Sequence, residues 1–193
     1  MPNPVQTNQT KTLVEDLVRQ LIVEIGEDPD REGLLGTPAR VAKSYKDLFS
    51  GYEKNLENII TVFDNEGYDE MVIAKDIEFY SMCEHHMLPF FGKAHIGYIP
   101  QDKIIGLSKL PRLMEVFSRR LQNQERLTSQ VARGLMDILN PKGVGVVIEA
   151  QHLCMMARGV EKQGASMTTS SVQGLFKKNL NTRNEFLRLI GKA

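Results

Sequence analysis

Two short clusters in the chain concentrate the residue types that bind borderline-soft metals. The first is Cys83-Glu84-His85-His86 and the second is His152-Leu153-Cys154, and together they use both cysteines and three of the four histidines. Thiolate and imidazole are the ligands that Zn²⁺ selects, at tetrahedral geometry. The two clusters therefore predict one metal site that forms when the chain folds.

The number of ligands determines which kind of metal site this is. Cys83 and His86 are separated by two residues, a common spacing for a chelating turn, and Cys154 completes a Cys₂His set. Three protein ligands leave the fourth position open for water, which is the catalytic arrangement. His85 and His152 then lie beside the metal without binding it, where a neutral imidazole moves protons near pH 7.

The same residues allow other interpretations. A closed structural zinc site would recruit His85 or His152 as the fourth ligand. The two cysteines are also compatible with buried apolar positions or with one disulfide, although the N-terminal sequence lacks the apolar region of a secretory signal. His95 stands in an alternating segment and is predicted to be a strand residue.

The composition is that of an ordinary globular protein. The 193 residues are 41% hydrophobic and 25% charged, and 24 Lys plus Arg balance 24 Asp plus Glu. A chain with no net charge has no overall basic excess for nucleic-acid binding. No apolar run approaches the roughly 18 residues of a membrane span. We expect a cytoplasmic protein with reduced thiols, no nucleic-acid partner and no membrane partner.

Hydrophobic spacing predicts helices first and a mixed region afterwards. Helical patterns cover residues 13–25, ended by Gly26, and the segment from Thr37-Pro38 to Gly51, where Thr37 is the expected N-cap. Later segments alternate as strands or repeat as helices: strands at 71–80, 91–99 and 143–154, and helices at 110–121, 127–139 and 186–190.

This order predicts an α+β fold with a mainly antiparallel sheet. We expect a helical N-terminal arm over residues 1–68 and a mixed domain over residues 69–193. Cys83 to His86 would lie in the connection between two strands. His152 and Cys154 share the parity of their predicted strand, so both would project from one face.

A second group of residues suits a nucleotide. Ser108 is the expected cap of a helix on which Lys109 and Arg112 share one face, and a helix N-terminus with two cations is a natural phosphate site. The chain has neither a P-loop motif nor G-x-G-x-x-G. Three further candidates lie elsewhere in the chain. Arg158 is a cation just after the second cluster, and Gln124-Glu125 suits the donor edge of a purine. Arg40 and Lys43 are two cations three residues apart on one predicted helix.

These motifs stand in the order seen in GTP cyclohydrolase I, which the chain resembles from about residue 10 to its end. The resemblance rests on the joint presence of Thr37-Pro38-x-Arg40-Val41-Ala42-Lys43, Cys83-Glu84-His85-His86, Gly106-Leu107-Ser108-Lys109, Gln124-Glu125-Arg126-Leu127, His152-Leu153-Cys154 and Asn181-Thr182-Arg183-x-Glu185-Phe186-Leu187. Each motif is short, but their combination in this order is highly specific.

The resemblance implies hydrolysis of GTP to 7,8-dihydroneopterin triphosphate and formate, the first step of tetrahydrofolate or tetrahydrobiopterin synthesis. It implies the tunnelling (T) fold, with two helices on one face of an antiparallel sheet, and an allosteric, toroidal homodecamer with sites at subunit interfaces. It assigns zinc to Cys83, His86 and Cys154, catalysis to His85 and His152, the guanine to Gln124 and Glu125, the ribose to Ser108, the triphosphate to Lys109, Arg112 and Arg158, and additional phosphate contacts from a neighbouring subunit to Arg40 and Lys43.

The chemistry of the substrate agrees with this assignment. Purine C8 is a weak electrophile, and zinc lowers the pKa of water toward about 7, which supplies a nucleophile at neutral pH. His152 is the leading candidate to give a proton to the imidazole ring of the purine. Two alternatives remain: a zinc-dependent purine-nucleotide hydrolase that stops at the ring-opened formamide, and a zinc-stabilised nucleotide-binding protein without catalysis.

Overall fold

The computed structural model describes residues 12–192, and the chain divides into two compact units between Asp47 and Leu48. The start of the chain, where the sequence shows no secretory signal, lies outside these residues. The first unit holds α1 (Leu13–Glu24) and nearly all of α2 (Thr37–Leu48), which confirms both predicted helices. Thr12 and Glu15 form a capping box at the start of α1, and Gly26 follows its end with φ of 87°.

The second unit is built around a five-stranded sheet with the order β5-β2-β3-β6-β7. All neighbouring strands are antiparallel except β2 and β5, which are parallel. The strands of this sheet are β2 (Val72–Cys83), β3 (Pro89–Ile99), β5 (Leu121–Gln122), β6 (Gly143–His152) and β7 (Met167–Gly174). A separate two-stranded sheet joins β1 (Val62–Asp64) to β4 (Lys103–Ile105).

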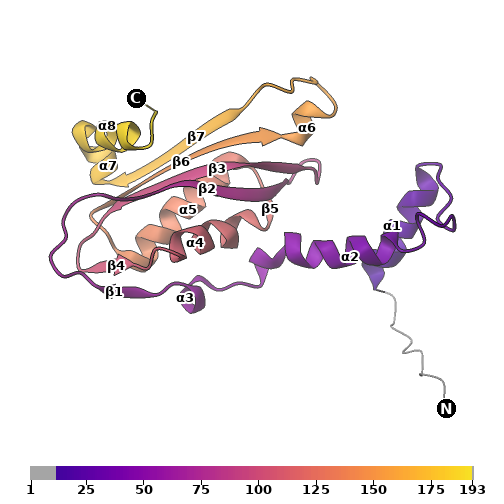
Figure 1. Ribbon diagram of the computed structural model, residues 1–193, viewed down its shortest axis with the longest axis horizontal. Helices are drawn as coiled ribbons and strands as arrows, with labels where there is room; N and C mark the ends of the chain where they lie inside the picture. The colour runs from indigo at the N-terminus through magenta and orange to yellow at the C-terminus, as the bar shows by residue number, and fades with distance from the viewer. Residues whose placement is uncertain (1–11, 193) are drawn as a thin grey trace, which may run out of the picture. The chain divides into compact units, whose positions relative to one another are not determined.

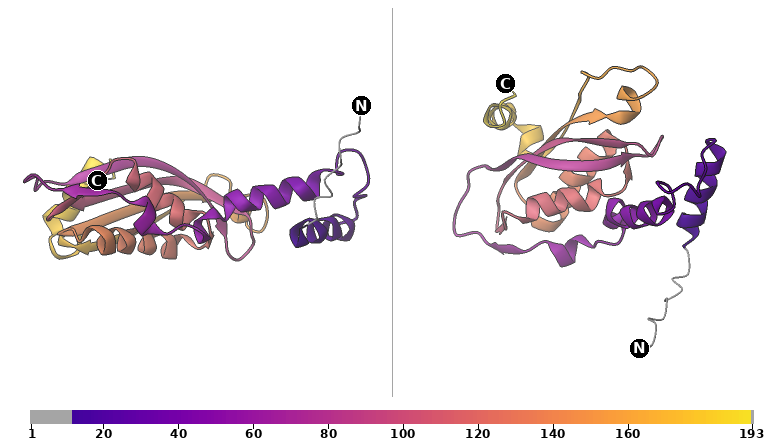
Figure 2. Two further views of the ribbon diagram at one scale, coloured as in Figure 1. Left: turned by 90° about the horizontal axis from the view of Figure 1, so that it is seen from below. Right: turned by 45° about the vertical axis from the view of Figure 1, so that its right-hand side comes forward.

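Helices cover both faces of the large sheet. Figure 1 and the right-hand view of Figure 2 show α4 and α5 on one side and α8 on the other. The remaining helical elements are short. The bounds are η1 (Ser50–Tyr52), α3 (Leu56–Ile59), α4 (Lys109–Ser118), α5 (Gln124–Leu139), α6 (Leu153–Met156), α7 (Leu175–Lys178) and α8 (Leu180–Leu189).

The alternation of β6 explains this layering. Val146 and Ile148 belong to the main core, which lies between the sheet and the long helices α4 and α5. Val147 belongs to a second cluster with Phe176 and Phe186, from α7 and α8. Because successive side chains of a strand point to opposite faces, one strand serves both layers. The predicted α+β architecture, with an antiparallel sheet and two long helices on one face, is confirmed.

Residues 48–68 pack with the second unit. The amide of Gly51 donates to the carbonyl of Arg119 at 3.0 Å, and β1 pairs with β4. The first compact unit therefore ends about twenty residues before the predicted end of the arm at residue 68. Within residues 12–192, no helix combines the length and apolarity needed to cross a membrane.

His95 is a strand residue of β3, as predicted, and its side chain is only 3% exposed. Its Nδ1 accepts from the amide of Asp76 at 3.3 Å, so the neutral ring carries its proton on Nε2. That Nε2 lies 3.7 Å from Oε2 of Glu149, which is also paired with Lys192. Burial lowers the pKa of His95, against the opposing charges of Asp76 and Glu149.

This lowered pKa predicts a loss of stability in acid. Below the ordinary pKa of about 6.5 the unfolded chain binds a proton that the folded chain does not, so stability falls as the pH drops from there through the folded value. The contribution of neutral His95 is complete above that range. We expect the melting temperature of the His95→Leu protein to fall less between pH 7 and pH 5 than that of the unmodified chain. If the melting temperatures of the two proteins fell equally over this pH range, His95 would not be the cause of the acid sensitivity.

Candidate metal centre and nucleotide site

The order of the strands brings the two metal-binding clusters together. Cys83 is the last residue of β2, and His152 is the last residue of β6. The strand β3 lies between them, and its first residues pair with both: Pro89 with Met82, and Phe90 with His152. The ends of β2 and β6 are therefore close. Ligand atoms of Cys83, His86 and Cys154 all lie within 4.8 Å of one another.

A tight turn after β2 aims His86 back at Cys83. The amide of Cys83 donates to the carbonyl of Leu88, and the amide of Met87 donates to the carbonyl of Cys83, both at 2.8 Å. Met87 has a φ of 52°, a left-handed conformation that closes the turn. As a result His86 Nδ1 lies 3.6 Å from the Sγ of Cys83.

Cys154 reaches the cluster from a helix, and the prediction that it shares a strand face with His152 is wrong. β6 ends at His152, and Cys154 lies in the first turn of α6, where the amide of Ala157 bonds to the carbonyl of Leu153 at 2.9 Å. The apolar run Leu153-Cys154-Met155-Met156 suits a strand or a helix equally, so periodicity alone does not locate the change.

The donor set fits a zinc ion. Cys83 and Cys154 are both free and buried. Burial, together with the neighbouring Cys83, raises the pKa of the Cys154 thiol. A divalent cation would supply the positive charge that keeps two adjacent sulfurs as thiolates. Two sulfurs and one imidazole nitrogen are the ligands of an open, three-ligand zinc site.

Arg158 brings a cation to the edge of this cluster, as the sequence suggested. Its Nη1 donates to the carbonyl of Cys154 at 3.2 Å and lies 3.4 Å from Nε2 of His86. Arg158 is exposed and lies two residues after the end of α6. A guanidinium in this position is available for an anionic group beside the metal ligands.

Glu84 links the metal-binding turn to the start of α5 by hydrogen bonds, a role that was not predicted from the sequence. Its carboxylate accepts from Asn123 Nδ2 at 2.9 Å and from Arg126, and its amide donates to the carbonyl of Gln122 at 3.0 Å. The hydrogen bond from Arg126 is the main cause that lowers the pKa of Glu84. The one sign of this role in the sequence is the position of Glu84, an acidic residue between two predicted metal ligands.

The two histidines proposed for catalysis have different surroundings. His152 stacks on Phe90, with ring centroids 4.6 Å apart and planes 2° from parallel, and its Nε2 lies 2.8 Å from Oε1 of Gln124. Burial lowers the pKa of His152, and the nearby charge of Glu125 opposes this. His85 has a side chain that is 67% exposed, with its Nε2 3.8 Å from Oε1 of Glu84.

The predicted guanine contacts differ in exposure. Gln124 is the first residue of α5 and is only 1% exposed, whereas the adjacent Glu125 is exposed. The amide of Gln124 faces the interior of the protein. Of the two, only the carboxylate of Glu125 is accessible to a ligand from solvent.

The start of α4 lies at the far end of the sheet from the metal-binding cluster. The amide of Ile105 donates to the hydroxyl of Tyr98, which pairs with Val72 at the opposite end of β2 from Cys83. α4 then runs back toward β5, which pairs with Cys83 (Figure 1). Its ten residues span about 15 Å. The structure therefore does not bring together the metal ligands and the predicted phosphate residues Ser108, Lys109 and Arg112.

The hydroxyl of Ser108 is not used as a helix cap. Ser108 occupies the N-cap position with helical φ and ψ of −68° and −10°, and its side chain makes no capping hydrogen bond. The expectation that it caps the helix is wrong because a cap needs an extended backbone to turn its oxygen onto the first amides. Ser108 is exposed, Lys109 is half-buried and Arg112 is exposed.

Arg40 and Lys43 are exposed residues of α2, in the first unit. Nη2 of Arg40 donates to the carbonyl of Gly33 at 3.4 Å and to Oγ1 of Thr37 at 3.3 Å. The two residues lie about one turn from each other on the same side of the helix, as their spacing predicted.

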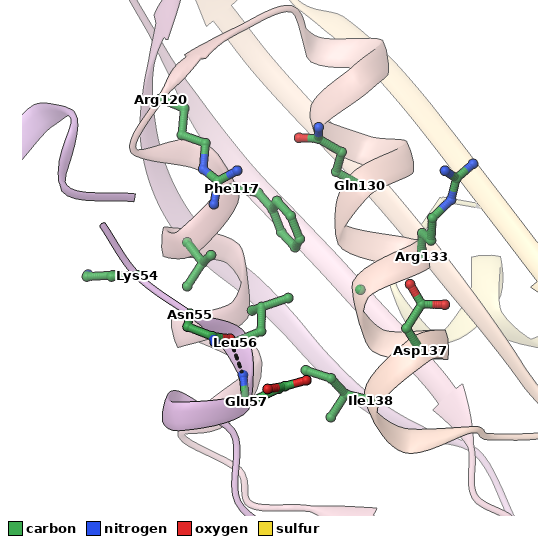
Figure 3. A pocket seen from close by; sticks show the side chains of 12 residues that line it. Lys54, Asn55, Leu56, Glu57, Phe117, Arg120, Gln130, Arg133, Asp137 and Ile138 are labelled. Atoms are coloured by element: carbon green, nitrogen blue, oxygen red, sulfur yellow. Dashed lines mark hydrogen bonds between the residues drawn. The ribbon is translucent and has the colours of Figure 1, made fainter. Parts of the chain in front are cut away.

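A cavity of about 630 Å³ lies apart from these residues, between α3, α4 and α5 (Figure 3). Its apolar wall includes Leu56 and Phe117, and charged side chains such as Arg133 and Asp137 stand at its edge. None of its lining residues is a predicted metal ligand or nucleotide contact. The candidate site is therefore defined by its converging side chains rather than by this cavity.

Comparison with known proteins agrees with the resemblance seen in the sequence. The family model of GTP cyclohydrolase I matches residues 14–191. GTP cyclohydrolase 1 of Chlorobaculum tepidum is 61% identical over 178 residues, which are 91% of this chain and 79% of the relative. The enzyme of the same name from Methylococcus capsulatus is 57% identical over 183 residues, which are 94% of this chain and 98% of the relative.

A third relative, GTP cyclohydrolase 1 of Wolinella succinogenes, is 57% identical over 92% of this chain and 95% of its own length. Among solved structures, the apo form of the archaeosine synthase QueF-Like aligns with 54% of this chain and 93% of its own, at 16% identity and a TM-score of 0.44. The family match and the relatives extend over nearly the whole chain. The chain belongs to the GTP cyclohydrolase I family.

Proposed function

We propose that this protein converts GTP into 7,8-dihydroneopterin triphosphate and formate, at a zinc centre held by Cys83, His86 and Cys154. The observation that carries the proposal is the convergence of these three ligand atoms within 4.8 Å in a member of the GTP cyclohydrolase I family. When bound, zinc would lower the pKa of a water molecule toward about 7 and so make a nucleophile available at neutral pH.

The residues of the chain would then supply proton transfer near the metal. His152 is the last residue of the strand that leads to Cys154, and its ring is fixed between Phe90 and Gln124. We assign to it the transfer of a proton, which its ring would first accept from the attacking water and then donate to the purine ring as that ring opens. His85 is exposed on the metal-binding turn and is the second proton-transfer group of the proposal.

The substrate would be held by two exposed charged side chains, Glu125 and Arg158. Glu125 offers an exposed carboxylate that can accept from the ring N–H and the exocyclic amine of guanine, a donor pair that adenine lacks. Arg158 offers a guanidinium for the triphosphate. Holding both ends of the nucleotide keeps purine C8 at the centre, which lowers the entropic cost of reaction. Gln124, the other predicted guanine contact, has its amide buried.

A complete site would need more than one copy of the chain. Ser108, Lys109 and Arg112 start a helix that begins at the opposite end of the sheet from Cys83. We propose that a neighbouring copy contributes this helix N-terminus to the ribose and triphosphate, and that Arg40 and Lys43 also act on a neighbour's phosphates. A homodecamer, allosteric control and a cytoplasmic location are parts of the proposal that the family resemblance supports.

Mixing two inactive variants tests the shared site. Cys154→Ala lacks the metal half, and Lys109→Ala/Arg112→Ala lacks the phosphate half. Co-expression of the two in equal amounts should restore about a quarter of the unmodified activity, because random assembly joins two intact halves at that frequency. The measurement is formate release by the co-purified assembly.

The control for this mixture puts all three substitutions on one chain and co-expresses it with Cys154→Ala. This pair offers no intact metal half and should stay inactive. If the first mixture is also inactive although both chains are present in one assembly, the two halves come from the same chain and the shared-site proposal is wrong.

Product analysis tests the reaction itself. Zinc-loaded protein is incubated with GTP, and formate and pterin fluorescence after oxidation are measured. Formate with a triphosphorylated pterin supports the proposed reaction. Formamide without pterin would favour the hydrolase that stops after ring opening, and unchanged GTP with bound zinc would favour a binding protein. Retention of fold after zinc removal separates a catalytic site from a structural one.

A further inference from the structure

The side-chain amide of Gln124 is engaged on every side. Its Nε2 lies 3.1 Å from the carbonyl oxygen of Ile148, 3.0 Å from that of Met167 and 3.1 Å from Oγ1 of Thr169. Carbonyl oxygens only accept, so the atom that faces them is the NH₂ group. The oxygen of the amide must therefore point the other way, toward His152.

The surrounding hydroxyls fix this orientation. Thr128 donates to the backbone carbonyl of Gln124 at 2.7 Å, and its Oγ1 lies 2.7 Å from that of Thr169. Since each hydroxyl has one proton, Thr169 donates to Thr128 and accepts from the amide of Gln124. The network joins α5 to β6 and β7, with all of its polar atoms paired, and gives the amide one orientation.

This orientation determines which nitrogen of His152 carries the proton. Oε1 of Gln124 only accepts, and it lies 2.8 Å from Nε2 of His152. Nε2 must therefore be protonated, which leaves the lone pair of the neutral ring on Nδ1. The stacking on Phe90, 2° from parallel, also fixes the plane of the ring. Tautomer and ring orientation are thus both set by neighbours that are buried.

We infer that Gln124 is a positioning residue for His152: it holds the ring as the Nε2–H tautomer, so that Nδ1 is the nitrogen that exchanges a proton with the substrate. The inference rests on the proposed function and deepens it. It replaces the contact with guanine that the sequence suggested for Gln124, because a side chain that is 1% exposed with its amide fully bonded is not accessible to a nucleotide. Glu125 remains the guanine contact.

The first test is made on the unmodified, zinc-loaded protein and needs no turnover. Histidine labelled with ¹⁵N distinguishes protonated from unprotonated ring nitrogens by solid-state NMR, and His152→Ala assigns the signals among the four histidines. The spectrum of the neutral His152 ring should show the proton on Nε2 and none on Nδ1. A proton on Nδ1 would overturn the inference, whether or not the protein turns over GTP.

The second test separates positioning from binding. Gln124→Met removes the acceptor at similar length, and we expect kcat to fall by about 10–100-fold, as for other residues that orient a reacting group, with zinc content unchanged and KM for GTP within about twofold. Gln130→Met makes the same replacement on the same helix, outside this network, and should leave kcat unchanged. If KM rose while kcat was retained, Gln124 would be a contact for guanine, and the inference would be wrong.

Discussion

Replacing Cys154 with alanine is expected to remove zinc and turnover together. Among residues 12–192, three protein ligand atoms converge at the site, so the loss of one sulfur leaves two, too few to hold the ion at tetrahedral geometry. Without the metal, water at neutral pH is a poor nucleophile toward purine C8, and formate release should fall by about 10³-fold or more. Metal analysis of the purified protein and a formate assay measure the two effects.

The fold of the Cys154→Ala protein provides the control. Cys154 lies in a four-residue helix after the last residue of β6, at the end of the main core, and most of the other residues of that core come from the strands and from α4 and α5. We therefore expect far-UV circular dichroism close to that of the unmodified chain. A variant that kept one zinc per chain and full turnover would show that Cys154 is not a ligand.

Replacing His152 with alanine should have the opposite signature, with zinc retained and chemistry slowed. The ring of His152 is held by Phe90 and Gln124 rather than by the cluster of metal ligands. A positioned proton donor contributes about 10²–10⁴-fold to a rate, so kcat should drop within that range while metal content stays the same. His95→Leu, which removes a buried histidine of β3, should leave kcat unchanged.

Metal content decides this prediction. If His152→Ala lost its zinc, His152 would be a ligand, and the site would be closer to a four-ligand structural centre. Steady-state kinetics on the zinc-loaded variant then distinguish a lost proton donor, which lowers kcat, from lost binding, which raises KM.

Local spacing made half of the metal site predictable. Cys83 and His86 are three positions apart, and a turn that follows a strand brings such a pair together without help from the rest of the fold. The approach of Cys154 depends on which strands are neighbours, information that no local pattern contains. The shared Cys and His chemistry of the two clusters nevertheless indicated that they meet.

Polar segments were harder to predict than apolar ones. β7 has the sequence Met-Thr-Thr-Ser-Ser-Val-Gln-Gly and forms the last strand of the sheet. It lacks the apolar alternation that marks a half-buried strand, so no strand was predicted there. Its pairing with β6 from Gly143 to Ala150, a tertiary effect, determines its conformation.

The role of individual side chains near the site depended most on the fold. Gln124 and Glu125 look alike in sequence as candidates for guanine, yet one is buried among carbonyl groups and the other is exposed. Similarly, Lys109 and Arg112 look like local phosphate contacts until the direction of α4 places them at the far end of the sheet. The residue types indicated which chemistry each side chain could perform, whereas burial and strand topology determined whether the side chain lies at the site.

The most direct measurement returns zinc stepwise to metal-free protein and follows formate release from GTP. We predict that the rate rises in proportion to added zinc and levels off at about one zinc per chain, with the triphosphorylated pterin formed in equal amount. Formate release at the full rate by metal-free protein, or a rate that does not respond to zinc, would contradict a catalytic centre built on Cys83, His86 and Cys154.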